Sequence, residues 1–458
     1  MLFNSYAFIF AFLPVTFAVY FVCLNIRWFT AGKLWLAIAS LCFYGYWNPK
    51  YIPLLLGSIL FNYAVGRRLL VRENRRKALL TFGLAANVLL LGYYKYADFL
   101  IDNWNGLTGS NTPLLHIILP LGISFFTFTQ IAYLVDAYRK KVQEYRFVNY
   151  VLFVTFFPHL IAGPILHHKD MMPQFDRLRN KVWNWRNLMS GLLLFCIGLS
   201  KKMLVADTLA GYANNGFAHA VHFVDAWIAC LSYTFQIYYD FSGYTDMAIG
   251  IALLFNIRLP QNFNSPYRAT SIQDFWRRWH ITLSQFLRDY IYIPLGGNRR
   301  GFWTANRNVL ITFLIGGLWH GASWMFILWG LLHGAGQAVQ NIWKRYGKPL
   351  PAWLCWGITF LFINITWVFF RAESLAQAFR ILRGMAGLSG LGFSGITDYI
   401  LIVPAILLLL LVTRVSPNLT ASASKRRPGW ATAALMALMF MISLLFFNRI
   451  TEFLYFNF

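Results

Sequence analysis

Charged residues are scarce in this chain of 458 residues, at 12%, and acidic residues are the scarcer kind, with 16 Asp and Glu against 40 Lys and Arg. Hydrophobic residues make up 58% of the sequence. Many apolar runs reach about 17 to 20 residues, roughly what a helix needs to cross the hydrocarbon core of a bilayer. The runs lack the two-residue alternation of an outer-membrane barrel, so helices are favoured. The composition excludes a soluble protein and predicts an all-α polytopic membrane protein.

Paired cysteines and several catalytic motifs are also absent. The cysteines stand singly within apolar runs, at Cys23, Cys42, Cys196, Cys230 and Cys355. Without metal-ligand spacing they predict buried structural thiols, and no bound metal is expected. The sequence has no G-x-S-x-G elbow, H-E-x-x-H motif or P-loop, which argues against the enzyme classes that use them. No bound cofactor is expected either.

The net charge of +24 is carried by short loops between the apolar runs. This pattern follows the positive-inside rule and predicts cytoplasmic loops facing a lipid bilayer, with no nucleic-acid partner. A basic cytoplasmic face also suits an anionic donor such as a coenzyme A thioester. The predicted spans are 5–24, 34–47, 51–66, 78–94, 114–135, 188–205, 226–256, 308–322, 325–343, 352–370, 399–413 and 431–447. Threading the chain through them puts both termini outside the cytoplasm, and the first run is expected to be a retained span rather than a signal peptide.

Two stretches do not fit a simple alternation of membrane-crossing helices and loops. Residues 147–166 lie between basic loops and contain the helix-breaking Pro158 and the pair Gly163-Pro164. They predict a re-entrant element buried in protein. Runs 308–322 and 325–343 are nearly continuous, which favours a buried hairpin over two full spans.

A few basic residues fall on or near the predicted outer side, against the positive-inside rule. They are Lys201, Lys202, Arg371, Arg380 and Arg383. The chain as a whole predicts one transmembrane domain, residues 1–447, followed by an extracytoplasmic tail, residues 448–458, that ends in FLYFNF.

Ionisable side chains within apolar runs are costly and usually face a cavity or a partner. His320 is the first such residue, in LIGGLWHGASWMFILWGLLHG, where glycines allow close packing or the close approach of a ligand. A neutral imidazole there could accept a proton from a hydroxyl group. A histidine that only bonds to a neighbouring helix is an equal alternative. His333, thirteen residues on, is expected to be structural.

The second place is PQNFNSPYRATSIQDFWRRWHITLSQFLRDYIYIPLGGNRRG, at 260–301. Ser271 and Asp274 have the spacing of a capping box, which predicts the start of an amphipathic helix at the cytoplasmic surface. His280 is expected on its apolar side. An interfacial helix whose histidine merely packs remains the alternative. The apolar face recurs at helical spacing, at Ile272, Phe275, Trp276, Trp279, Leu283, Phe286 and Leu287.

The third place is YTFQIYYDFSGYTDMAIGIALLF, with Asp240 and Asp246 in an otherwise apolar span. Six residues apart, they do not share a helix face closely, so a paired-carboxylate acid–base device is disfavoured. Either carboxylate could orient a histidine or pair with an arginine. Structural pairing is the favoured interpretation.

The segments DFSGYTDMAIG, LPQNFNSPYRATSIQDFWRRWHITLSQFLRDYIYIPLGGNRRG and GGLWHGASWMFILWG closely resemble the membrane-bound O-acyltransferase family. They match its bacterial branch, which serves alginate O-acetylation and, more distantly, D-alanyl transfer to teichoic acid. The similarity runs from MLFNSYAFIFAFLP at the N-terminus to the last residue. It implies a ring of tilted helices around a central tunnel that joins a cytoplasmic donor entrance to an outer acceptor entrance.

The resemblance also implies roles for individual residues. His320 matches the catalytic histidine of the family, and His280 matches its second motif histidine. The terminal FLYFNF resembles a tail motif whose tyrosine is proposed to carry the acyl group, and Tyr455 is the matching residue. Residues expected to line the donor site or tunnel are Trp276, Arg277, Trp279, Asp240, Asp246, Trp319 and Ser323.

The expected activity is O-acyl transfer, most simply of acetyl. The donor would be acetyl-CoA or another cytoplasmic thioester, and the acceptor an exported polysaccharide such as alginate or cellulose. The resemblance implies a bacterial inner-membrane protein whose partners are a periplasmic or membrane-anchored SGNH-type acetyltransferase and the polysaccharide synthesis and export machinery. The alternatives are a D-alanyl or lipid acyltransferase of the same family, a polytopic transporter of donor or glycan, and a tail that only anchors the chain.

Overall fold

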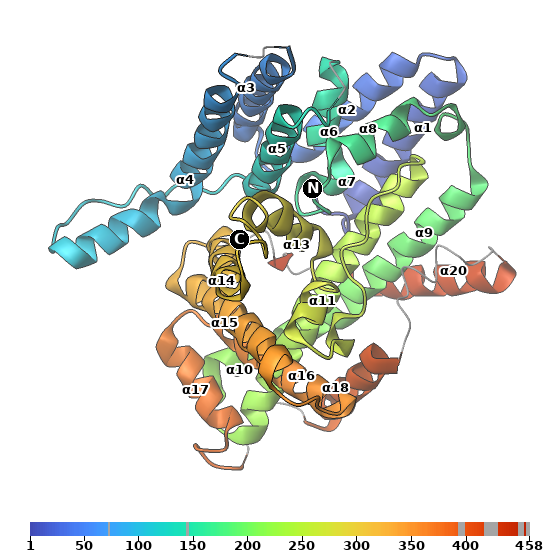
Figure 1. Cartoon of the computed structure of the whole chain (residues 1–458). Helices are drawn as coiled ribbons and strands as arrows, with labels where there is room; N and C mark the ends of the chain where they lie inside the picture. The colour runs from blue at the N-terminus through green and yellow to red at the C-terminus, as the bar shows by residue number, and fades with distance from the viewer. Residues whose placement is uncertain (72–73, 143–145, 393–398, 416–428, 448–452, 455–458) are drawn as a thin grey trace. The chain divides into compact units, whose positions relative to one another are not determined.

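A computed structural model describes the chain except for residues 72–73, 143–145, 393–398, 416–428, 448–452 and 455–458. Every regular element in the described part is a helix (Figure 1). The prediction of an all-α polytopic protein is confirmed. Tyr455 lies outside the described residues.

The described chain forms two compact units, and helices α9, α11 and α20 contribute residues to both. The predicted division into one transmembrane domain and a tail stays a prediction. The first unit comprises Met1–Cys196, Tyr244–Pro260 and Arg427–Met436, and the second Ile197–Gly243, Gln261–Arg426 and Ala437–Phe458.

The first unit consists mainly of the N-terminal helices. They are η1 (Ala7–Phe12), α1 (Leu13–Asn25), α2 (Phe29–Gly45), η2 (Pro49–Tyr51), α3 (Ile52–Val71), α4 (Arg76–Thr108), α5 (Ile123–Tyr138), α6 (Phe147–Thr155), α7 (Phe157–Leu160), α8 (His168–Asp176), η3 (Leu178–Asn180) and most of α9 (Trp185–Ser200).

The second unit carries most of the motif residues singled out in the sequence, including His280 and His320, whereas Asp246 belongs to the first unit. Its helices are η4 (Lys201–Ala206), α10 (Asp207–His219), most of α11 (Phe223–Leu254), η5 (Pro266–Arg268), α12 (Ile272–Trp276), α13 (Ile281–Leu287), η6 (Arg288–Tyr292), α14 (Phe302–His320), α15 (Trp324–Tyr346), α16 (Ala352–Arg371), α17 (Leu375–Met385), α18 (Tyr399–Val415) and part of α20 (Trp430–Leu445).

Among the described residues, five helices are long and apolar enough to cross a membrane. Each of the five overlaps a predicted span. The predicted span 114–135, in contrast, is wrong over its first residues. Helix α5 begins only at Ile123, because Gly122 has a left-handed backbone (φ 71°) and the residues before it form no helix. The five candidates are Ala7–Asn25, Pro49–Val71, Arg76–Thr108, Trp185–His219 and Ala352–Arg371.

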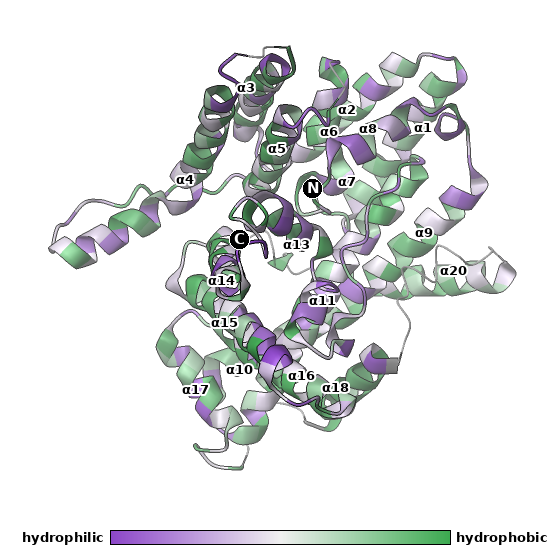
Figure 2. Ribbon diagram, viewed as in Figure 1, coloured by the Kyte–Doolittle hydropathy of each residue, from purple (hydrophilic) through white to green (hydrophobic). Residues whose placement is uncertain are grey.

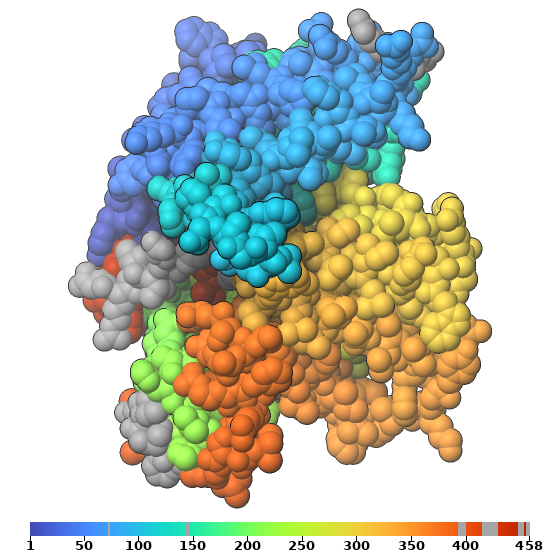
Figure 3. Space-filling model, turned by 90° about the vertical axis from the view of Figure 1, so that its left-hand side faces the viewer, coloured from blue at the N-terminus to red at the C-terminus, as the bar shows by residue number. Residues whose placement is uncertain are grey.

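The candidate spans differ in how much protein covers them. Only 11% of the apolar window of Arg76–Thr108 is buried, against 61% for Trp185–His219. In Figure 3, α3 and α4 (blue to cyan) form a continuous exposed surface of the first unit. Figure 2 shows α18 and α20 mostly green, as their apolar sequences require. Exposed apolar helix faces are explained by contact with lipid.

The stretch 147–166 is broken and buried, as predicted. Helix α6 ends at Thr155, Phe156 takes a non-helical conformation (φ −49°, ψ 109°), and Pro158 lies in the first turn of α7. Most side chains of the stretch are buried. Proline at a helix start needs no backbone N–H partner, which explains why the break falls just before it.

Helices α14 and α15 form the predicted hairpin and pack along each other, but it is only partly buried, because side chains such as Trp324 and Val339 are exposed. Gly317 and Gly330 meet at the crossing, where a Cβ on either residue would lie 3.1 Å from the Cα of the other. Small residues let two helix backbones approach this closely. His320 is the last residue of α14, so the hairpin fixes its position.

Two of the basic residues that broke the positive-inside rule, Arg371 and Arg380, have local partners. Arg371 donates from Nη2 to Asn214 Oδ1 at 2.9 Å, and Arg380 donates to the backbone oxygens of Phe217 and Ala218. Those oxygens lie in the last turn of α10, where unpaired carbonyls favour cations.

The prediction that all five cysteines are buried is wrong in part. Cys196 and Cys230 are buried, Cys23 and Cys355 are intermediate, and Cys42 is exposed. Cys42 lies in an apolar helix, and a membrane helix can turn such a face outward to lipid.

Candidate functional site

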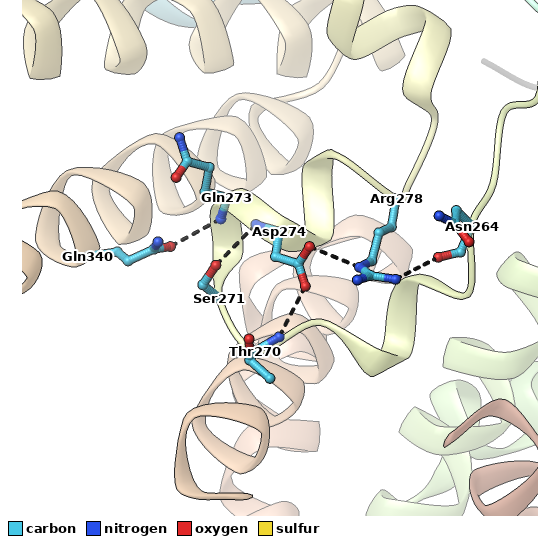
Figure 4. Close-up of polar contacts among 7 residues, drawn as sticks. All are labelled: Asn264, Thr270, Ser271, Gln273, Asp274, Arg278 and Gln340. Atoms are coloured by element: carbon cyan, nitrogen blue, oxygen red, sulfur yellow. Dashed lines mark hydrogen bonds and ion pairs between the residues drawn. The ribbon is translucent and has the colours of Figure 1, made fainter. Parts of the chain in front are cut away.

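The predicted amphipathic helix is broken into two short helices. Its start is as expected, because Ser271 Oγ accepts from the Asp274 backbone N–H at 3.1 Å (Figure 4). Asp274 accepts in turn from the Thr270 N–H at 3.4 Å and from Arg278 Nε at 2.9 Å. The Arg278 guanidinium also donates to the Asn264 backbone oxygen at 3.3 Å. These bonds hold a turn after α12, which ends at Trp276 instead of continuing.

His280 lies at the break between the two helices, where the chain changes direction. Its backbone is left-handed (φ 42°, ψ 54°), an uncommon conformation for a residue with a side chain, and α13 begins directly after it. The Ile281 N–H bonds to the Asn262 backbone oxygen at 3.0 Å, which ties the break to the preceding loop. A strained residue held by its surroundings is typical of functional sites. The sequence pattern missed this break because the apolar spacing continues through it.

Asn262 determines which nitrogen of His280 carries the proton. The Asn262 Oδ1 atom accepts from the Thr282 backbone N–H at 3.1 Å and from Thr282 Oγ1 at 2.9 Å. His280 Nδ1 lies 3.2 Å from the same oxygen. Because that oxygen can only accept, Nδ1 must be the donor, so the neutral imidazole presents Nε2 as its acceptor. Sequence reasoning did not single out Asn262, although it lies in the quoted PQNFN stretch.

The His280 ring is completely buried and surrounded by aromatic rings. The Phe241 ring lies edge-on at 4.8 Å between centroids, and the Trp319 ring lies at 6.1 Å. His280 is outside the candidate membrane-spanning helices, and its burial lowers the pKa of the imidazole to about 3. The ring therefore stays neutral at physiological pH.

His320 is held by packing against rings on three sides. Trp319 and Trp329 lie 5.0 Å from it between ring centroids, and Phe370 lies at 5.2 Å. The side chain is 2% exposed. Trp319 thus contacts both motif histidines, and the second unit brings them to one aromatic cluster, which we call the histidine cluster (His280, Trp319 and His320).

The other predicted lining residues fall in three different settings. Trp279 is core, stacked on Phe275 at 5.6 Å, and Trp276 donates from Nε1 to His333 Nδ1 at 3.2 Å. Arg277 is exposed. Ser323 caps α15 by accepting from the Met325 N–H at 3.2 Å, a role the sequence analysis did not foresee.

Asp240 pairs with a lysine rather than with a histidine or an arginine. Lys202 Nζ lies 3.0 Å from Asp240 Oδ1 and 2.7 Å from Asp207 Oδ1, and all three side chains are at most 4% exposed. Asp240 is therefore paired, as the favoured interpretation expects, while its role stays a prediction. Asp246 is also buried, at 4% exposure. Lys202 was noted in the sequence only as a misplaced charge, and its partners could not be predicted.

The tail returns to this part of the second unit. Phe453 is buried at 2% exposure, with its ring 5.9 Å from Phe241, which also packs on His280. The backbone N–H of Leu454 donates to Asp240 Oδ2 at 2.9 Å. The residue after Leu454 is Tyr455, which lies outside the described residues.

A cavity of about 410 Å³ opens beside α12 and α13. Arg277 and Arg288 line it together with Trp276, and Arg288 is bonded to Asp289 at 2.7 Å. Polar amides complete the wall. They belong to Gln273, Gln285, Gln337 and Asn341. A cavity with two guanidinium groups and an indole suits a ligand that carries phosphates and an aromatic ring.

Across the part of the chain that the structure describes, no group of three or more His, Cys, Asp or Glu side chains could hold a metal ion. A family model for membrane-bound O-acyltransferases matches residues 99–376, which include both motif histidines. The chain belongs to this family.

Named relatives of this O-acyltransferase fall into acetyl and D-alanyl groups. The peptidoglycan O-acetyltransferase of Helicobacter pylori is 51% identical over 427 residues, covering 85% of this chain and 80% of the relative. The probable alginate O-acetylase AlgI of Pseudomonas aeruginosa is 42% identical over 399 residues, covering 84% and 75%. The teichoic acid D-alanyltransferase of Bacillus subtilis is 27% identical over 288 residues, covering 57% and 71%. The predicted family, enzyme class and membrane location are confirmed.

Proposed function

We propose that this O-acyltransferase moves an acetyl group from a cytoplasmic thioester to an exported glycan, with Tyr455 as a transient carrier. The observation that carries the proposal is the meeting of three elements in the second unit. His280 and His320 share Trp319 as a neighbour, and Phe453 reaches His280 through Phe241. Catalytic groups and a candidate acceptor must lie within reach of one another for a covalent relay.

In the first step the Tyr455 hydroxyl oxygen attacks the thioester carbonyl carbon. The new C–O bond forms as the C–S bond breaks, and His320 takes the phenol proton and returns it to the leaving thiolate. A phenol with a pKa near 10 and a thiol with one near 8.5 are similar leaving groups, so little transfer potential is lost. His280, with Nε2 as acceptor, suits the positioning of the hydroxyl better than the donation of a bond to the oxyanion.

The cavity beside Arg277 and Arg288 is the proposed entrance for acetyl-CoA. Its guanidinium groups would bind the phosphates of the donor, and Trp276 would offer a ring face to the adenine. The stretch 258–307, which contains Arg277 and Arg288, is one of the basic loops that predict a cytoplasmic face. A cytoplasmic entrance matches the cellular location of acyl-CoA thioesters.

In the second step the acetyl ester on Tyr455 is transferred to a hydroxyl group on the outer side of the inner membrane. The acceptor oxygen forms the new ester bond, and the tyrosine oxygen leaves with a proton. The acceptor would be a serine of a periplasmic or membrane-anchored SGNH-type partner, or a sugar of the glycan, next to the export machinery. Identity of 51% and 42% to the two O-acetylating relatives, against 27% to the D-alanyltransferase, favours acetyl as the group. The higher identity to the peptidoglycan relative than to the alginate relative favours peptidoglycan as the glycan.

A transport assay run in parallel with a transfer assay tests this function. Purified protein in liposomes is given acetyl-CoA, and release of free coenzyme A and acetylation of an added glycan are measured. We expect both in the wild type and neither in His320→Ala. His222→Gln, which changes a histidine bonded to the Ser389 backbone oxygen, should keep both. Movement of donor or glycan across the wild-type membrane with no thiol release would identify a transporter instead.

A further inference from the structure

A buried charge cluster lies outside the proposed chemistry. Lys202 is bonded to Asp207 at 2.7 Å and to Asp240 at 3.0 Å, with side-chain exposures of 2% to 4%. One ammonium group faces two carboxylates, so the cluster has more acceptor oxygens than the lysine can satisfy. Buried carboxylates are stable only when further donors reach them.

The chain's own C-terminal segment supplies one such donor. The Leu454 backbone N–H bonds to Asp240 Oδ2 at 2.9 Å, while the preceding Phe453 packs on Phe241. Two consecutive residues of the tail therefore contact two consecutive residues of α11. A backbone bond combined with a side-chain contact at the neighbouring position fixes the register in which the tail lies against α11.

The local structure explains why the cluster forms here. Helix α9 continues into the π-helical turn η4, which begins at Lys201. Gly243 faces this turn. A Cβ on Gly243 would lie 2.7 Å from the backbone oxygen of Gly198 and 3.2 Å from the backbone nitrogen of Lys202. Glycine allows the two backbones to approach. That approach brings Lys202 beside Asp240, one turn before Gly243 on α11.

We propose that the cluster of Lys202, Asp207 and Asp240 is a docking site for the C-terminal segment, with Asp240 as the positioning residue. It binds Phe453 and Leu454 through the Leu454 N–H and sets the position of the residue that follows, Tyr455. Only this last consequence rests on the proposed carrier function. The docking itself requires no acyl transfer.

Timed digestion with a carboxypeptidase tests the docking on the full-length protein in detergent. Intact mass follows the loss of residues from the C-terminus. Wild-type trimming should slow sharply on reaching Leu454. In Asp240→Leu it should pass Leu454 about tenfold faster or more, since a hydrogen bond to a charged group is lost. Lys202 keeps Asp207 as a partner in this variant, so no buried charge is left alone. Asp240→Asn keeps an acceptor oxygen and should fall between the two.

Ser443→Ala is the matched control, because it removes another buried polar contact, Ser200 to Ser443 at 3.1 Å. Its trimming should equal the wild type. If the carboxypeptidase passes Leu454 at the same rate in the wild type and in Asp240→Leu, the docking is overturned. It is also overturned if Ser443→Ala accelerates this step as much as Asp240→Leu does. If Asp240→Leu does not fold, Asp240→Asn decides by the same comparison with wild type. Asp240-dependent trimming with no acetyl on wild-type Tyr455 would leave the docking intact and contradict only the carrier function.

Discussion

The two motif histidines are fixed in place by different means. His280 lies at a break between two short helices, with a left-handed backbone and a hydrogen bond to Asn262. His320 ends a regular helix of a glycine-packed hairpin and is enclosed by the rings of Trp319, Trp329 and Phe370. One imidazole has its tautomer set by polar contacts, and the other has its position set by packing.

This difference suggests that the two histidines have different roles in the reaction. A histidine that donates from Nδ1 to a fixed acceptor keeps the same nitrogen available through the reaction. A histidine held by ring contacts has its ring orientation fixed and suits repeated uptake and release of a proton. The two regions should therefore respond differently to substitution.

The largest effect is expected at His320. In His320→Ala the proposed base is gone, and kcat for acetyl transfer should fall by about 10² to 10⁴. Release of free coenzyme A measures it. A variant that retains near wild-type turnover would remove His320 from the chemistry.

Asn262→Ala should reduce kcat by about 10² without changing the KM for acetyl-CoA, because His280 loses the bond that orients it. Asn262→Asp keeps the acceptor oxygen and should recover much of the loss. Wild-type activity in Asn262→Ala would show that the orientation of His280 does not depend on the bond to Asn262.

Arg277→Ala should raise the KM for acetyl-CoA by about three- to tenfold with little change in kcat, because its guanidinium group lines the proposed donor cavity. Arg300→Ala, an exposed arginine outside the cavity lining, is the control. An equal rise of the KM for acetyl-CoA in both variants would mean that the overall positive charge of this surface, rather than Arg277 itself, attracts the donor.

The smallest effect concerns stability in acid. The pKa of His280 is lowered to about 3 in the folded protein, against about 6.5 in the unfolded chain. Protons therefore bind the unfolded chain preferentially, and stability falls as pH drops from about 6.5 toward 3. His280→Gln should show a smaller decrease in melting temperature between pH 7.5 and pH 5. If the melting temperature of His280→Gln decreases as much as that of the wild type, the His280 ring is reached by water in the folded protein.

The sequence predicts the regular parts of the fold well and the irregular parts poorly. The hairpin, the broken stretch 147–166 and the capping box at Ser271 follow from glycine, proline and capping patterns. The break at His280 does not, because apolar residues recur through it at helical spacing.

Pairings between distant residues are the other limit. The resemblance to the family points to both histidines, but their shared contact with Trp319 depends on how α14 packs in the second unit. The partners of Lys202 come from two helices, and the Leu454 contact spans 214 residues of sequence. No local pattern encodes such contacts, so the partners of Asn262 and Lys202 became visible only in the structure.

The most direct test of the account is the mass of the tryptic peptide 450–458 after incubation with acetyl-CoA. This peptide follows Arg449 and contains Tyr455 and one other hydroxyl residue, Thr451, which fragmentation can distinguish. We expect one acetyl group on Tyr455 in the wild type and none in His320→Ala or Tyr455→Phe. A bare peptide in an enzyme that still acetylates its acceptor, with Tyr455→Phe fully active, would contradict the relay.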